Sequence, residues 1–403
     1  MNEKKKLQPK VRFREFTGEN APDWEQRKFI DIVERLNKTG DNVKLPRIEF
    51  EDIVSGEGRL NKDLNTKKDD RKGIFFDENN ILYGKLRPYL RKWYYARFAG
   101  VAIGDFWVLK IINNNHPLFI YYLIQTEKYQ RVANDTSGTK MPRSDWKKVS
   151  ESLFYIPNIN EQKKISTIFN IIDNLITLHQ RKLEQLEQLK NTLLSKMFPK
   201  SGTNIPEIRF SGFTDAWKQR KLSQILLERN QQSIQTDEYP LVSFTVENGV
   251  TPKTERYDRE QLVTGDKDKK KYKITKYDDI VYNPANLKFG AISRNKYGNA
   301  VFSPIYVTFE VNKNDYLPSF IEYYVIRWDF INYALRFQQG TVYERKSVNV
   351  ADFLKLRFCS PDKTYQGKLS SLFIIIDDYI AIHQRKLEQL KNLKQTLLNK
   401  MFI

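Results

Sequence analysis

Several short stretches of this chain interleave basic, amide and aromatic side chains. They are 83–98, 136–148, 267–276, 283–298 and 338–348. Lysine and arginine bind phosphates, and arginine, lysine, asparagine and glutamine also form hydrogen bonds with base edges in the major groove. These residue types therefore predict contact with a polyanion. For each single residue a plain solvated surface role stays open, and the lysine run favours backbone contact over base reading.

The candidate contact residues divide between the two halves of the chain. In the first half they accompany Tyr89, Trp93 and Tyr94, and in the second half they accompany amides such as Asn283 and Gln338. Loops that combine charge with amide or aromatic groups suit a domain that reads sequence. The basic candidates are Lys85, Arg87, Arg91, Lys140, Arg143, Lys288, Arg294, Lys296, Arg345 and Lys346.

The charge of the whole chain agrees with a polyanionic partner. Its 403 residues carry a net charge of +19, which favours nucleic acid or an acidic membrane surface, although a lysine-rich solvated surface has the same composition. The strongest apolar runs, 118–124 and 372–376, are too short to span a bilayer. A single cysteine, Cys359, and an N-terminus that does not resemble a signal peptide favour a cytoplasmic protein with no membrane partner.

Motifs for covalent chemistry are incomplete. Asn283-Pro284 begins like a DNA amino-methyltransferase motif, but Ala285 and Asn286 follow it and no glycine-rich cofactor loop accompanies it, so a turn is predicted. The segment 360–368 lacks the acidic-x-Lys strand of a nuclease, and no Gly-Lys-Ser/Thr sequence occurs. One cysteine and three scattered histidines do not supply a zinc site. We therefore expect no enzyme activity and no metal, while an unusual active site stays open.

A repeat defines the elements that position these stretches. The sequence HQRKLEQL occurs at 179–186 and at 383–390, and the surrounding segments 175–198 and 379–402 are identical at 17 of 24 positions. The openings 9–29 and 206–222 also match each other, whereas the middles 30–155 and 223–355 diverge. The chain therefore consists of two copies of one plan.

The repeated closing segments are predicted to be long helices. Each carries a 4-3 apolar spacing over more than four heptads, which is typical of a coiled coil. The stripe residues predicted to pair the helices or dock subunits are Ile172, Ile176, His179, Leu183, Leu186, Ile376, Ile380, His383, Leu387 and Leu390. A helix of 36–40 residues is about 55–60 Å long and needs a partner for its single apolar stripe.

The obvious partner is the other copy, in an antiparallel pair about a pseudo-twofold axis. A bundle with helices of another subunit is compatible with this pair. His179 and His383 interrupt the stripes and are interpreted as residues that set the register. Lys190 and Lys394 also interrupt the stripes, and we expect them to extend past them to solvent.

The resulting fold class is mixed α/β (α+β), with two α/β domains separated by two long antiparallel coiled-coil helices. Strands are predicted within 100–112 and 299–311, and helices at 117–135 and 318–337, each of which opens with proline. The predicted divisions are a first α/β domain at 1–159, a first long helix at 160–198, a linker at 199–206, a second α/β domain at 207–362 and a second long helix at 363–403.

This organisation resembles the specificity subunits of Type I restriction-modification enzymes. The resemblance covers essentially the whole chain and is carried by the closing helices with HQRKLEQL, by the segments that precede them and by the half openings. The run Glu161-Gln162-Lys163-Lys164-Ile165 is intact in the first half, whereas the second half has Gln366-Gly367-Lys368-Leu369. The glycine-threonine turns that lie near DNA in the resemblance add Thr139 and Thr341 to the candidate contact residues.

The resemblance implies a DNA-reading subunit without an active site. Each variable middle would read one half of a bipartite, asymmetric sequence in double-stranded DNA, and the helices would set the gap between the halves. The helices would also dock two modification (methyltransferase) subunits, which bind S-adenosylmethionine. Restriction subunits using ATP and Mg²⁺ would join them, and this chain itself would hold no cofactor.

Two other classes of function stay open. The first is a stand-alone DNA-modifying enzyme, against which the incomplete motifs argue. The second is a coiled-coil scaffold that binds RNA, DNA or a membrane through charge alone, without preference for a DNA sequence.

Overall fold

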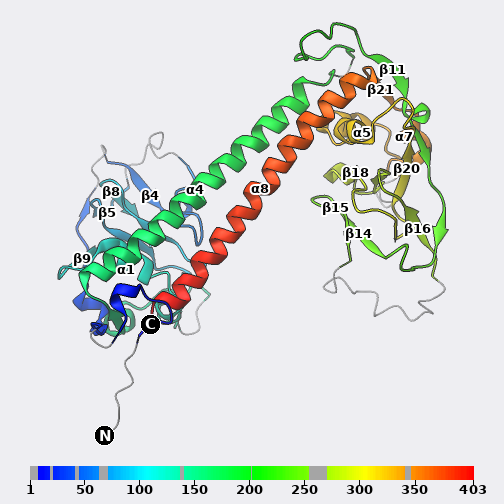
Figure 1. Ribbon diagram of the computed structural model, residues 1–403. Helices are drawn as coiled ribbons and strands as arrows, with labels where there is room; N and C mark the ends of the chain where they lie inside the picture. The colour runs from blue at the N-terminus through cyan, green and yellow to red at the C-terminus, as the bar shows by residue number, and fades with distance from the viewer. Residues whose placement is uncertain are drawn as a thin grey trace. The chain divides into compact units, whose positions relative to one another are not determined.

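The computed structural model describes residues 8–18, 21–40, 45–62, 71–136, 140–200, 202–253, 270–340 and 346–403. The chain divides into two compact units, one made of 1–181 with 384–403 and the other of 182–383. Each unit contains a mixed α/β domain and part of each of two long helices (Figure 1). These helices are α4 (Ile159–Lys196) and α8 (Lys363–Met401). The expected mixed α/β class with tandem domains is confirmed.

The domain of the first unit is built from short strands and three short helices. Its strands are β1 (Glu25–Lys28), β2 (Val33–Leu36), β3 (Thr39–Gly40), β4 (Arg47–Glu49), β5 (Gly73–Phe76), β6 (Ile81–Gly84), β7 (Trp93–Tyr95), β8 (Gly100–Ile103), β9 (Phe106–Ile111) and β10 (Leu153–Ile156). Its helices are α1 (Pro117–Leu123), α2 (Glu127–Ala133) and α3 (Trp146–Glu151). The predicted proline start is confirmed, because Pro117 occupies the first turn of α1. The prediction of one helix over 117–135 is wrong, since α1 and α2 are separated at 124–126.

The domain of the second unit has a similar order of elements. Its strands are β11 (Lys218–Lys221), β12 (Leu226–Glu228), β13 (Gln232–Ser233), β14 (Val242–Thr245), β15 (Gly249–Pro252), β16 (Tyr272–Thr275), β17 (Ile280–Tyr282), β18 (Ile292–Arg294), β19 (Ala300–Phe302), β20 (Val307–Val311) and β21 (Arg357–Ser360). Its helices are α5 (Pro318–Val325), α6 (Trp328–Leu335) and α7 (Val350–Lys355).

One sheet is common to the two domains. Its strand order is β2-β9-β6-β7 in the first unit and β12-β20-β17-β18 in the second, antiparallel throughout. The register agrees as well, because Ile81 pairs with Tyr95 and Leu109 while Ile280 pairs with Arg294 and Phe309. The second sheets differ in extent. In the first unit the order is β3-β5-β8-β4, with β4 parallel to β8, whereas in the second unit β13-β16-β19 is joined to the hairpin β14-β15 by a parallel bridge between Leu241 and Val301.

Within each unit the two long helices run antiparallel. In the first unit the ring of Phe169 lies 5.9 Å from that of Phe402, and Asp173, farther along α4, meets Lys394, farther back along α8. In the second unit Lys190 meets Asp377 and Phe198 lies 6.0 Å from Phe373, so the order again reverses. The heptad stripes face inward.

The stripe side chains are buried or half-buried in both units. Ile172 and Ile176 of α4 and Ile376 of α8 are buried. The others, His179, Leu183, Leu186, Ile380, His383, Leu387 and Leu390, are half-buried. A stripe of this kind shields one side of each helix from water over most of its length. The register-setting role of the two histidines stays a prediction.

The lysines that interrupt the stripes form a repeated polar lock. In the first unit Lys394 Nζ lies 2.7 Å from Asp173 Oδ1, and Tyr122 Oη of α1 donates to Asp173 Oδ2 at 3.1 Å. The Lys394 side chain is only 12% exposed, so the expectation that this lysine extends to solvent is wrong. Its ammonium lies in the helix interface because a carboxylate from the opposite helix neutralises it there.

The second unit repeats the lock 204 residues along both helices. Lys190 Nζ lies 2.6 Å from Asp377 Oδ1, and Tyr323 Oη of α5 donates to Asp377 Oδ2 at 2.8 Å. The expectation for Lys190 is therefore wrong for the same reason. Burial and the neighbouring carboxylate raise the pKa of Tyr323, so the phenol stays protonated and remains a donor. Each lock ties a domain helix to both long helices.

The starts of the two long helices are held differently. In the first unit Glu161 is fully buried and accepts hydrogen bonds from Arg12 Nε at 2.7 Å and from Trp24 Nε1 at 3.3 Å. Tyr365 occupies the corresponding position of α8, and its ring packs against Phe213 at 4.8 Å and Phe210 at 5.3 Å. The changed run at the second helix start thus replaces an ion pair with an aromatic cluster.

Removing the charge from one lock should weaken the fold. Lys394→Met leaves Asp173 half-buried without its ammonium partner, so we expect the free energy of unfolding in urea to fall by about 1–3 kcal/mol. The exposed Lys386 lies on the same helix, and Lys386→Met should change stability by less than about 0.5 kcal/mol. Equal unfolding midpoints for the two variants would contradict the role of the lock.

Candidate nucleic-acid interface

Backbone pairing brings together the two basic stretches of the first domain. Lys85 O accepts from Ser144 N at 2.9 Å, and Arg87 N donates to Pro142 O at 2.7 Å. The segment that follows β6 therefore runs antiparallel to 142–144. As a result Lys85, Arg87 and Arg143 share one surface, although more than 50 positions separate the two stretches.

Asp105 organises the charge on this surface. Its carboxylate lies 3.1 Å from Arg143 and 3.7 Å from Lys85. The hydrogen bond from Arg143 lowers the pKa of Asp105, partly offset by burial, and the positive charges of Arg143 and Lys85 lower it further. Arg87 and Lys140, on the same two stretches of the chain, are exposed, so the surface keeps a positive excess. Such an excess is what a phosphate-contacting surface needs.

The turn after β6 has an uncommon backbone. Arg87 (φ 47°) and Arg91 (φ 51°) both adopt the left-handed conformation, which costs free energy for residues other than glycine. Between them, the 3-10 turn Pro88–Leu90 exposes the ring of Tyr89. The conformation thus presents two arginines and one aromatic ring on a single short turn.

The corresponding turn of the second domain, 283–290, presents a different set of side chains. Asn283 Oδ1 accepts from Ala285 N at 3.1 Å, which confirms that Asn283-Pro284 forms a turn. Lys288 is exposed, and its ammonium lies 4.9 Å from the centroid of the exposed Phe289 ring. An exposed cation beside an exposed ring suits a phosphate or a base.

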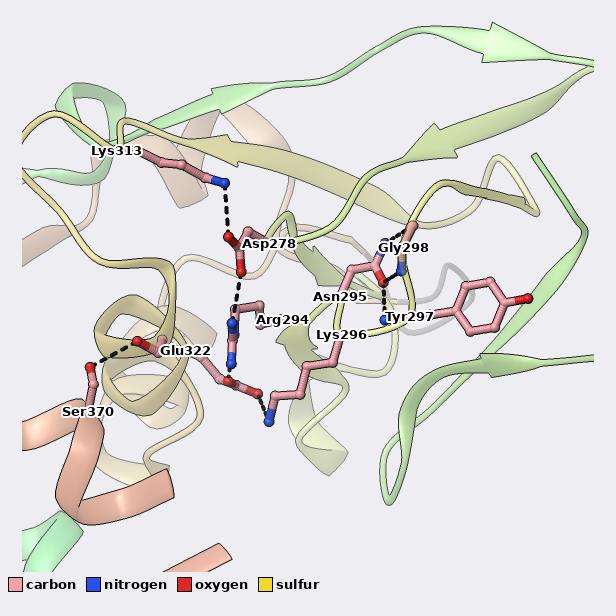
Figure 2. Close-up of polar contacts among 10 residues, drawn as sticks. Asp278, Arg294, Asn295, Lys296, Tyr297, Gly298, Lys313, Glu322 and Ser370 are labelled. Carbon is pink, nitrogen blue, oxygen red and sulfur yellow. Dashed lines mark hydrogen bonds and ion pairs between the residues drawn. The ribbon is translucent and has the colours of Figure 1, made fainter. Parts of the chain in front are cut away.

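Arg294 and Lys296 belong to an ion-pair network within the second domain (Figure 2). Arg294 Nη1 lies 2.8 Å from Asp278 and its Nε lies 3.0 Å from Glu322 of α5. Lys296 is also paired with Glu322, at 3.0 Å, and Lys313 with Asp278, at 2.9 Å. Because the Arg294 side chain is only 12% exposed, a base contact would require both of its ion pairs to open.

Burial and charge oppose each other in this network. Burial disfavours the ionised form of Asp278, but hydrogen bonds from Lys313 and Arg294 outweigh it, so the pKa of this carboxyl lies below its ordinary value. The network joins β18, α5 and the turn before β17, and thereby fixes the edge of the shared sheet. Its members come from separated segments, so the spacing of Arg294 and Lys296 in the sequence did not indicate their partners.

Of the remaining candidates, the structure describes Lys346. It is exposed and directly precedes Ser347, which exchanges two backbone hydrogen bonds of 2.9 and 3.0 Å with Gln339. Thr139, Thr341 and Arg345 lie outside the described residues. DNA contact by any of these candidates stays a prediction.

Catalytic features are scarce among the residues that the structure describes. In this part of the chain no group of three or more His, Cys, Asp or Glu side chains could hold a metal ion. Burial raises the pKa of the Cys359 thiol, which makes it a poor nucleophile. No helix in the described ranges is long and apolar enough to cross a bilayer.

Substitutions of Arg294 and Lys288 should have different effects on the stability of the protein. Arg294→Gln leaves Asp278 and Glu322 without this guanidinium, so we expect the free energy of unfolding to fall by about 1–3 kcal/mol. Lys288→Gln should be nearly neutral, because Lys288 is exposed. Urea unfolding of the two variants checks this, and an unchanged stability of Arg294→Gln would show that its ion pairs contribute little.

A comparison with protein families gives a match in the first half of the chain. Residues 22–188 match the model described as the Type I restriction modification DNA specificity domain. This range covers the first domain, from before β1, and the part of α4 that carries HQRKLEQL.

Curated relatives match over part of their length. The chain is 24% identical over 261 residues to the Type I restriction enzyme MjaVIII specificity subunit of Methanocaldococcus jannaschii, covering 59% of this chain and 56% of the relative. It is 28% identical over 127 residues to the Escherichia coli Type I restriction enzyme EcoDI specificity subunit, covering 30% of this chain and 28% of the relative. The chain thus spans about half or less of these relatives.

Solved structures share the fold over nearly the whole chain. The S subunit of a Type I restriction-modification system from M. genitalium aligns with a TM-score of 0.61 at 14% identity, over 98% of this chain and 99% of that one. A chain from a structural study of complex assembly in a type I R-M system aligns with a TM-score of 0.51 at 14% identity, over 94% and 97%. At this identity the solved structures show a shared fold, and the family match covers residues 22–188.

Proposed function

We propose that this chain recognises DNA sequence for a Type I restriction-modification system. The premise is the match of residues 22–188 to the Type I restriction modification DNA specificity domain. The observation that carries the proposal is the basic surface made by the paired segments 85–87 and 142–144. It combines arginines for phosphate or base contact with an exposed tyrosine, on a turn fixed by backbone hydrogen bonds.

We further propose a bipartite DNA target. Two domains share the β2-β9-β6-β7 type of sheet and its register but carry different side chains at the following turn, Arg87 and Tyr89 against Lys288 and Phe289. The same scaffold with different reading residues would suit two different half-sites. The long helices, of 38 and 39 residues, are each about 57 Å long, which exceeds one turn of DNA.

Partner subunits would supply the chemistry. We propose that two modification subunits, which bind S-adenosylmethionine, dock on the long helices, and that restriction subunits with ATP and Mg²⁺ complete the assembly. This chain would then act without catalysing a step itself and would work in the cytoplasm.

A repeated exposed apolar face supports docking on the helices. In the first unit Ile171, Leu175 and Leu178 lie beside the buried stripe at helical spacing, and Leu178 is 60% exposed. In the second unit their counterparts Ile375, Tyr379 and Ile382 are exposed too. An apolar face that recurs in both units is more than scattered surface residues, and it suits a subunit interface.

The recognition proposal predicts separable half-sites. Methylation should be mapped in cells that contain the modification subunits, with and without this chain, and we expect a motif of two half-sites at a fixed gap. Arg87→Ala should relax one half-site and Lys288→Gln the other, because each removes a contact from one domain only. Methylation without such a motif would contradict the proposal, and salt-sensitive binding without sequence preference would favour the charge-driven scaffold instead.

The docking proposal predicts a loss of assembly. Combining Leu175→Ser with Leu178→Ser should weaken binding of the modification subunit by about tenfold or more, because apolar contact area is lost. Leu227→Ser is the matched control, since Leu227 is 71% exposed but lies on β12. Titration of the subunits by calorimetry measures both, and equal affinities would place the interface elsewhere.

A further inference from the structure

One carboxylate in the first unit contacts both long helices. Glu57 Oε1 lies 3.0 Å from Lys391 Nζ of α8, and Glu57 Oε2 accepts from Gln180 Nε2 of α4 at 3.0 Å. Arg59 Nε, from the same loop, donates to Oε2 at 2.6 Å. Burial disfavours the ionised form of Glu57, but the hydrogen bonds from Lys391 and Arg59 outweigh it and lower its pKa.

The loop that carries Glu57 is fixed from within the domain. Gly58 has φ +67°, and a Cβ at this position would collide with the hydroxyl of Tyr121 on α1. Lys92 Nζ donates to Ile53 O at the start of the loop. The loop therefore has a defined conformation that does not depend on Glu57 alone, so a substitution of Glu57 should leave the domain folded.

The same loop is bonded to the candidate DNA-reading turn. Gly56 N donates to Arg91 O at 2.9 Å, and Arg91 N donates to Pro88 O at 2.9 Å. Gly56 directly precedes Glu57 in the chain, so the bond to Arg91 and the carboxylate belong to neighbouring residues. A short covalent and hydrogen-bonded path thus leads from α4 and α8, through Glu57 and Gly56, to the turn that presents Arg87, Tyr89 and Arg91.

We propose that Glu57 is a positioning residue that orients this reading turn relative to the two long helices. The inference rests on the proposed function, because orientation matters only if the turn reads DNA. The ends of the two helices pack into the core of the domain, where Phe169 contacts Tyr122 and Phe402 contacts Phe119, and the lock at Asp173 adds a polar contact there. Glu57 contacts Gln180 and Lys391, which lie farther from these helix ends, and so it restricts tilting of the domain about the core contacts.

Gap discrimination is the property that this contact should control. A DNA target with two half-sites is read only if each reading turn meets its half-site at the correct distance and helical phase. One base pair added to the gap changes both the distance between the half-sites and their helical phase. A domain that can tilt on the helices tolerates such a shift, whereas a domain that is also held at Glu57 does not.

The test uses the full chain assembled with its modification subunits and a set of DNA substrates. The substrates keep both half-sites and carry the native gap or a gap changed by one base pair. For wild type we expect strong preference for the native gap, and for Glu57→Ala we expect this preference to fall by about tenfold, with the half-site sequences unchanged. Glu51→Ala is the matched control, since Glu51 is exposed in the same segment.

Lys391→Met supplies an independent route to the same result. It removes the other member of the ion pair, so it should reduce gap preference as well, and the double variant should be little worse than either single variant. If Glu57→Ala proves unstable in a thermal melt, Lys391→Met decides. Wild-type gap preference in both variants overturns the proposal and leaves the recognition function intact, whereas failure of wild type to methylate any two-part target overturns the proposed function instead.

Discussion

The pairing of Asp173 with Lys394, and of Asp377 with Lys190, is the interaction on which the rest of the structure depends. Apolar stripes alone bury area but fit one another in several registers, one heptad apart. A charged pair between helices fits only one of them, because any slip leaves a half-buried ammonium and carboxylate apart. The tyrosine that joins each carboxylate extends this choice of register to the domain helices α1 and α5.

The pair of long helices was largely predictable, because the heptad spacing is periodic and occurs in both halves of the chain. The heptad spacing and the 204-residue offset predict two long helices and the stripes that face inward. The locks were not predictable, because Asp173 and Lys394 are 221 positions apart and Lys394 only looked like an interruption of a stripe. The partner of a charged side chain follows from tertiary pairing, which a one-dimensional pattern does not contain, although an aspartate at the same offset in both halves was a usable signal.

The candidate nucleic-acid interface was also predictable only in part. Composition grouped 83–98 and 136–148 as contact loops, and backbone bonds do join them at Lys85 and Ser144. Composition did not distinguish Arg294 from Lys288, since both are basic residues in one stretch. The difference arises from Glu322, 28 positions beyond Arg294, which α5 brings against β18. Residue type therefore identified the surface, whereas the role of each cation depended on which carboxylates the fold placed beside it.

The starts of the two long helices show that different residues can hold a helix start against the opening segment. Glu161 and Tyr365 occupy corresponding places in the two long helices, yet Glu161 forms a buried ion pair with Arg12 whereas Tyr365 packs against Phe213. The opening segments contain the same residue types, since Arg12 matches Arg209 and Phe16 matches Phe213. The residue on the long helix therefore decides the contact, because a carboxylate pairs with an arginine and an aromatic ring packs on a phenylalanine. At the locks both members of the ion pair are repeated in the two helices, so their chemistry is the same in both units, whereas at the helix starts the residue of the long helix has changed and the contacts diverge.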